Sequence, residues 1–188
     1  DSAVPIHVLT LIVIREMPTT FWWYLLGSAC VYGAVVPFWF IGAKHVALRF
    51  DMSIAAADVL MLFPEGSMVI VAPLMGCIIE RGKWSLVKRL RVQAFALVFI
   101  TCAFISLAWL PLPPAPVTVI LGVAYACAQN LIWASITLAT PPGRLNICVG
   151  LVGSAVNLLP TLIPACLFQG DGPTDHTVLA AVAAVGVS

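Results

Sequence analysis

The longest uncharged run in this chain limits its fold more than any other feature. It extends from Val92 to Gly143, 52 residues without Asp, Glu, Lys or Arg. A helix crosses the hydrocarbon core of a bilayer with about 20 apolar residues, so this run is too long for one crossing. The segment PLPPAPV (111–117) divides it, because proline lacks a backbone donor and disfavours helix in the residue before it. The run therefore predicts two membrane-spanning helices joined by a turn at the membrane surface.

Composition extends this conclusion to the whole chain. Hydrophobic residues make up 62% of it and charged residues 9%, whereas soluble domains usually carry about 25% charged residues. The net charge of +1 argues against nucleic-acid binding, since phosphate recognition needs an extended basic face. We therefore expect an all-α membrane protein that has lipid around its apolar surface and no nucleic acid among its partners.

The remaining apolar runs complete a bundle of six predicted transmembrane helices, the last one truncated. Residues 1–16 are predicted to form a linker or interfacial segment, and residues 17–188 one helical bundle. Pro160 and Pro164 predict a kink in the fifth helix. The chain starts at Asp1 and stops inside the sixth apolar run, so we expect it to be part of something longer. The predicted spans lie near residues 19–42, 54–79, 92–110, 117–139, 145–168 and 177–188.

Basic residues gather on one side of the predicted membrane. Alternating crossings place on that side the Arg15–Glu16 segment, the 80–91 loop and the 140–144 loop. The positive-inside rule then predicts that the 80–91 loop is cytoplasmic. Basic side chains of this loop are expected to contact anionic lipid headgroups. The seven of nine basic residues on this side are Arg15, Arg81, Lys83, Lys88, Arg89, Arg91 and Arg144.

The stretch GCIIERGK contains the pattern G-x-x-x-(D/E)-R-G-K. Gly76, late in a helix, is expected to let a neighbouring helix approach closely. Gly82 is expected to form a tight turn between Arg81 and Lys83. Glu80 is expected to lie against the positive N-terminus of another helix, where it would act as a breakable latch. Together these residues predict a gating motif.

This motif resembles the signature of the major facilitator superfamily, which lies between the second and third and between the eighth and ninth helices of those transporters. Three longer stretches are similar to the seventh, tenth and eleventh helices of the MFSD-one-like lysosomal dipeptide transporters. They are REMPTTFWWYLLGSACVYGAVVPFWFIGAK (15–44), GVAYACAQNLIWAS (122–135) and LNICVGLVGSAVNLL (145–159). The matching residues are Pro18, Phe21, Trp22, Cys30, Tyr32, Pro37, Phe38, Gly122, Tyr125, Trp133, Leu145, Gly150, Asn157 and Leu158.

The resemblance implies the C-terminal half of a secondary transporter, helices seven to twelve. Such a half, with an N-terminal six-helix bundle, would move dipeptides or similar small organic solutes by alternating access around a central site. The organelle would be lysosome-like if the family role holds, and another organelle membrane otherwise. The alternative is a structural subunit derived from such a transporter, which packs against other membrane subunits and lipid and transports nothing itself.

Glu65 lies inside the second predicted span, where an ionised carboxylate is costly. It would be a protonatable group on the solute pathway or a partner for the amino end of a peptide. Alternatively, it lies near the membrane surface or is paired inside the bundle. The surrounding FPEG (63–66) indicates a local helix break that would let Glu65 reach water.

Trp133 lies within the fourth predicted span, with Gln129 and Asn130 about one turn before it. An aromatic ring and two amides could line a cavity and hold a peptide backbone by hydrogen bonds. The alternative is ordinary helix packing. Tyr32 and Tyr125 are weaker candidates of the same kind for substrate binding.

No pattern of catalytic residues is present in the sequence. We find no plausible Ser/His/acid set, no metal-ligand spacing and no phosphate-binding glycine loop. The six cysteines fall singly inside or at the edges of apolar runs, which is typical of small membrane-buried side chains. We therefore expect no enzyme activity, no metal and no cofactor.

Overall fold

The computed structural model describes residues 15–167, and within this range the chain is helical, with no strand. Each of the five long helices is long and apolar enough to cross a membrane, so five predicted spans are confirmed as helices of this kind. The predicted sixth span, residues 177–188, lies outside the described residues, as do residues 1–14 of the predicted linker. The helices are α2 (Thr19–Arg49), α3 (Ile54–Gly82), α4 (Leu86–Trp109), α5 (Pro114–Ala139) and α6 (Leu145–Leu167).

Four of the five helices, α2 to α5, are longer than the spans predicted for them. Helix α2 continues to Arg49, seven residues beyond its predicted end. The predicted 80–91 loop is only a three-residue connection, 83–85, because α3 ends at Gly82 and α4 begins at Leu86. Long basic side chains can reach water from a helix end, so a helix need not stop where charge begins. Charge marks the edge of the hydrocarbon core, whereas capping sets the helix boundary.

Prolines inside the apolar runs do not break the helices. Helix α3 is continuous through Pro64 and Pro73, so the expected break at residues 63–66 is wrong. Helix α6 likewise remains helical through Pro160. Membrane helices tolerate proline because neighbouring groups can satisfy the freed backbone. The predicted turn between the third and fourth spans is present at residues 110–113, but residues 114–117 already belong to α5. Helix α5 begins at Pro114, where a missing N–H has no cost.

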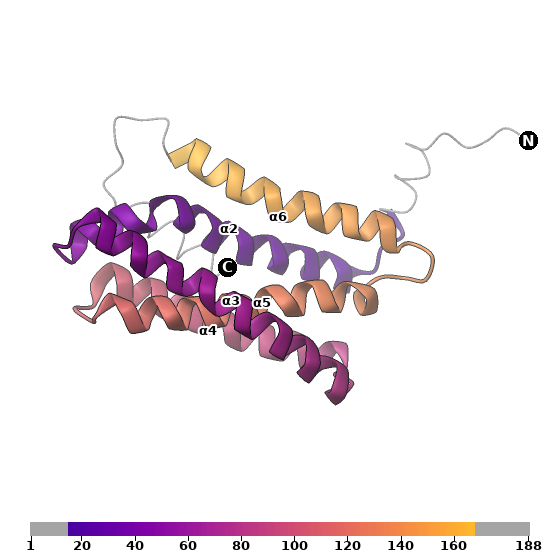
Figure 1. Cartoon of the computed structure of the whole chain (residues 1–188). Helices are drawn as coiled ribbons and strands as arrows, with labels where there is room; N and C mark the ends of the chain where they lie inside the picture. The colour runs from indigo at the N-terminus through magenta and orange to yellow at the C-terminus, as the bar shows by residue number, and fades with distance from the viewer. Residues whose placement is uncertain (1–14, 168–188) are drawn as a thin grey trace, which may run out of the picture.

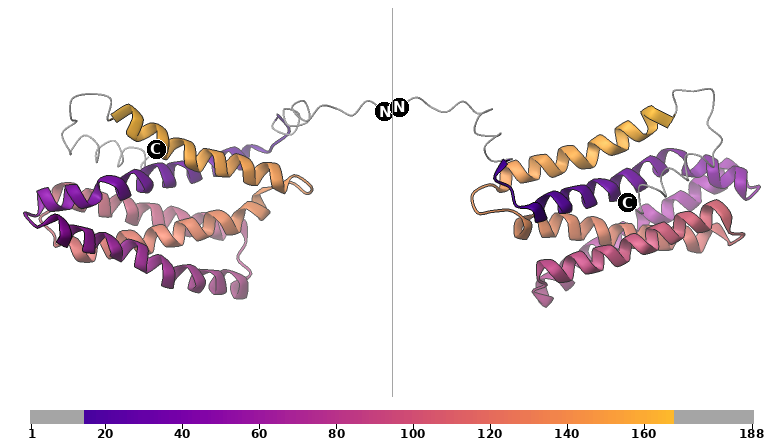
Figure 2. Two further views of the ribbon diagram at one scale, coloured as in Figure 1. Left: turned by 45° about the horizontal axis from the view of Figure 1, so that its top comes forward. Right: turned by 180° about the vertical axis from the view of Figure 1, so that it is seen from behind.

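Helix α5 occupies the centre of the bundle. It packs against α3 and α4 and, less extensively, against α2, which in turn packs along α6. Successive helices run in opposite directions, and α6 and α4 lie on opposite sides of the α2–α5 pair (Figure 1). The views of Figure 2 show that α6 is covered on one side by α2. The largest fully buried side chains are Phe21, Phe38, Phe104, Ile100, Leu107, Leu121, Leu131 and Ile132.

Helices α3 and α5 approach each other closely at Gly122 of α5. A side chain at this position would collide with the Cα atom of Pro64 and the hydroxyl of Ser67 in α3. Small residues permit such contact between membrane helices. Gly76 has only open space beside its Cα atom, so the close contact expected there is absent from the described bundle.

We predict that Gly122→Ala destabilises the bundle because the new methyl group overlaps the backbone of α3. Overpacking of this kind costs about 1–3 kcal/mol. Thermal unfolding of the purified protein in detergent, followed by circular dichroism, should show a lower melting temperature. Gly76→Ala is the matched control, and it should be neutral or slightly stabilising because alanine favours helix. Equal melting temperatures for the two variants would contradict the close crossing.

Candidate functional site

Side chains of α2 and α5 form a hydrogen-bonded group of aromatic and amide residues. The Trp133 indole Nε1–H donates to the Tyr32 hydroxyl at 2.8 Å. The side chain of Gln129, one turn before Trp133, lies near the same hydroxyl. The structure therefore brings together three predicted site residues from two helices that are about one hundred residues apart in sequence.

The rings of Tyr125 and Trp39 pack beside this hydrogen-bonded group on its buried side. The Tyr125 ring lies 5.9 Å from the ring of Tyr32 and 5.9 Å from that of Trp39, both in edge-to-face arrangements. Tyr125 is only 3% exposed and belongs to the main core. It therefore supports Tyr32 from behind. We call Tyr32, Trp39, Tyr125, Gln129 and Trp133 the α2–α5 aromatic cluster.

The course of α3 leaves one face of this cluster open. Gln129 and Trp133 lie seven and eleven residues after Gly122, which places all three on nearly the same face of α5. Helix α3 covers that face at Gly122 but then crosses over, because Met75 and Ile79 pack against Leu131 on the opposite face. The diverging ribbons are visible in Figure 1. Trp133 consequently remains 39% exposed.

Glu65 lies on α3, directly after the proline that contacts Gly122. Its nearby residues Met61 and Met68 pack against the main core. Glu65 itself is exposed, on the same face of α3 as the exposed Leu62 and Val69. It forms no ion pair with any described residue, since the one ion pair found between residues 15 and 167 joins Arg144 to Glu16. No contact between Glu65 and the α2–α5 aromatic cluster is present.

Asn130 is not joined to the cluster. Its Nδ2 group donates to the Ala126 carbonyl of its own helix at 2.7 Å. Neighbouring residues on a helix point about 100° apart, so Asn130 and Gln129 cannot both face Tyr32. Of the two amides, Gln129 is the one positioned for a shared site.

The end of α3, which carries the predicted gating motif, differs from the expected structure. Lys83, not Gly82, adopts the left-handed conformation, with φ 45°, and closes the helix. Gly82 is the last helical residue, and the Trp84 indole occupies the space where a side chain would lie. Glu80 and Arg81 are exposed, and neither is ion-paired within the described chain. The expected tight turn at Gly82 is therefore wrong, while the latch formed by Glu80 stays a prediction.

Arg89 has a structural contact that sequence reasoning missed. Its guanidinium donates to the backbone carbonyl of Trp84 at 3.0 Å and also to that of Ala134 in α5. This links α4 to the end of α5. The sequence predicts a headgroup contact for Arg89, because a basic residue near a helix start gives no sign that a carbonyl of another helix is within reach.

No metal site is present among residues 15–167, where no three His, Cys, Asp or Glu side chains come together. The α2–α5 aromatic cluster offers instead the face of Trp133, the hydroxyl of Tyr32 and the amide of Gln129, whereas the Tyr125 side chain is buried. Such groups can stack against a ligand and form hydrogen bonds with it.

Comparisons with protein-family models, with curated proteins and with solved structures give no match for this chain.

We predict a measurable coupling between Tyr32 and Trp133. Hydrogen bonds between membrane helices contribute about 0.6 kcal/mol on average, so Tyr32→Phe and Trp133→Phe should be non-additive by roughly that amount. Unfolding of the two single variants and the double variant in mixed micelles with increasing denaturant measures this coupling. Tyr32→Phe combined with Asn130→Ala is the control cycle and should be additive. Additivity in both cycles would show that the indole–hydroxyl bond does not form.

Proposed function

We propose that this chain is the C-terminal half of a secondary transporter of the major facilitator superfamily type, which moves dipeptides or similar small organic solutes by alternating access. The observation that carries the proposal is the partly open α2–α5 aromatic cluster with its Tyr32–Trp133 hydrogen bond. Binding sites of such transporters lie near the bilayer midplane, at the interface between two bundles.

The depth of the cluster supports a site inside the membrane. Tyr32 lies thirteen residues after the start of α2 at Thr19, or about 20 Å along the helix axis. The hydrocarbon core is about 30 Å thick, so this hydroxyl lies well within it. A partly buried hydroxyl and an exposed indole at that depth gain little from contact with lipid chains. They gain more from a polar solute or from another polar surface.

The available groups suit a small peptide. The Gln129 amide and the Tyr32 hydroxyl can form hydrogen bonds with a peptide unit, and the Trp133 face can stack on a side chain. Glu65, exposed on α3, would be the partner of a peptide ammonium group. The remaining contacts would come from a second six-helix bundle that faces the open side of the cluster.

A second candidate function is a structural membrane subunit derived from such a transporter. One observation favours it: the Trp133 N–H group already has a partner in Tyr32, so the cluster is satisfied without any ligand. The outer face of α3 is also strongly apolar and open, with Val69 76% exposed. In this role the same surfaces would contact unrelated helices and lipid.

Transport gives the direct test of the proposal. The native assembly, purified with any second bundle attached and reconstituted into liposomes, should take up a radiolabelled dipeptide. Trp133→Ala should lower the initial uptake rate about tenfold, the effect of roughly 1.4 kcal/mol of lost interaction. Trp109→Ala is the matched control, because Trp109 is exposed at the far end of α4 and should leave uptake unchanged.

Glu65→Gln gives a second readout in the same assay. If the carboxylate holds the peptide ammonium group, this change slows uptake of a free dipeptide more than uptake of its N-acetylated form. Absence of uptake by an assembly that contains a second bundle would exclude transport of these solutes and favour the structural role.

The proposed topology places the 83–85 connection in the cytoplasm, together with the other basic segments at that end of the bundle. In a variant with the six native cysteines replaced, Lys83→Cys should react with a membrane-impermeant maleimide from the cytoplasmic side alone. Leu112→Cys, in the connection between α4 and α5, should react from the opposite side alone. The reverse labelling pattern would invert the proposed orientation.

A further inference from the structure

An apolar groove of about 380 Å³ runs between α4 and α5 on the outside of the bundle. Its walls carry hydrocarbon side chains and one thiol, with no charged group. The groove is also separate from the α2–α5 aromatic cluster, with which it shares no residue. The lining residues are Val92, Phe95, Ala96, Phe99, Val119, Ile120, Val123, Ala124 and Cys127.

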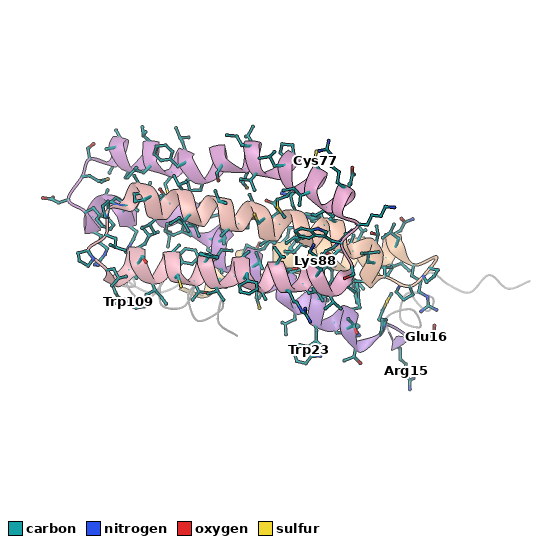
Figure 3. The ribbon with its side chains drawn as sticks, turned by 90° about the horizontal axis from the view of Figure 1, so that it is seen from below. Arg15, Glu16, Trp23, Cys77, Lys88 and Trp109 are labelled. Atoms are coloured by element: carbon teal, nitrogen blue, oxygen red, sulfur yellow. The ribbon has the colours of Figure 1, made fainter. Side chains whose placement is uncertain are left out.

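Two basic side chains of α4, Lys88 and Arg91, lie beyond the groove on the same side of the helix. Lys88 precedes Val92 by four residues, and Arg91 precedes Phe95 by four residues, so each lies one turn from a groove residue on the same strip of the helix. Both are exposed. Figure 3 shows Lys88 toward the end of the bundle that carries Arg15 and Glu16, away from Trp109. The strip therefore passes from charge at the membrane surface to hydrocarbon at depth.

These two charges are not neutralised within the described chain. The Lys88 ammonium lies 4.4 Å from the centre of the Trp84 ring, a contact that orients the side chain while leaving its charge. Neither Lys88 nor Arg91 forms an ion pair with an acidic residue between positions 15 and 167. Arg89, between them, is already used by backbone carbonyls.

We infer that this groove and these two residues bind one anionic glycerophospholipid. An acyl chain fills the groove, and the phosphate of the headgroup lies against Lys88 and Arg91. From Arg91 to Phe99 the strip extends about 12 Å along the helix, enough to hold the upper part of an acyl chain below its headgroup. A zwitterionic lipid fits less well, because its own cation faces the same two basic side chains. This site is independent of the proposed transport function.

Native mass spectrometry of the full chain, released from detergent after mixing with dioleoyl-phosphatidylglycerol or dioleoyl-phosphatidylcholine, tests the inference. We expect one retained phosphatidylglycerol and markedly less phosphatidylcholine. Each of Lys88→Gln and Arg91→Gln should weaken phosphatidylglycerol binding about fivefold, the effect of one basic residue near an anionic lipid. Lys44→Gln, an exposed lysine on α2, is the matched control and should have no effect.

Filling the groove separates its role from that of the charges. Val123→Trp should abolish retention of the lipid, while Val98→Trp, on α4 but outside the groove, should not. Val119→Phe is a milder change that serves if the first variant does not fold, as judged by circular dichroism. Equal retention of the two lipids, or phosphatidylglycerol retention unchanged by the charge and groove variants, would overturn the inference.

Discussion

The backbone of α3 lies directly against α5 where Gly122 faces Pro64, and the rest of the bundle is arranged around that crossing. Because two helices this close must diverge on either side of their contact, α3 reaches α2 at one end and the α4 side of α5 at the other. The same divergence leaves Trp133 uncovered. The exposure of Trp133 in the candidate site thus follows from the contact at Gly122, about three helical turns earlier on α5.

The α2–α5 aromatic cluster combines two properties that usually exclude each other. The hydrogen bond from the Trp133 indole to the Tyr32 hydroxyl stabilises the pairing of α2 with α5, yet one face of the cluster is open. A ligand at this face would have to compete with the existing bond or use the lone pairs and ring surfaces that remain. Weak, replaceable interactions of this kind suit a solute that must leave as readily as it enters, whereas permanent burial by another subunit would make the same residues a fixed contact.

Hydropathy and proline positions were sufficient to predict the five helices that the structure describes, because apolar length is what a bilayer selects. The details of contact were not predictable in the same way. Gly76 and Gly122 look alike in sequence, but only Gly122 has a helix against it. Arg89 lies among basic residues typical of a membrane surface, yet it binds a carbonyl of α5. The sequence named Tyr32, Gln129 and Trp133 as separate candidates, but it did not predict that they meet, since this depends on the angle at which α2 and α5 pack.

Helix α6 is attached to the bundle almost entirely through α2, with only slight contact to α5. Gly33 of α2 lies against Leu159 and Ile163 of α6, and Arg144 at the start of α6 is tied to Glu16 just before α2. In mechanical terms, a sideways force on α6 is transmitted to α5 mainly through α2. Any displacement of α6 would therefore act first on α2, the helix that carries Tyr32.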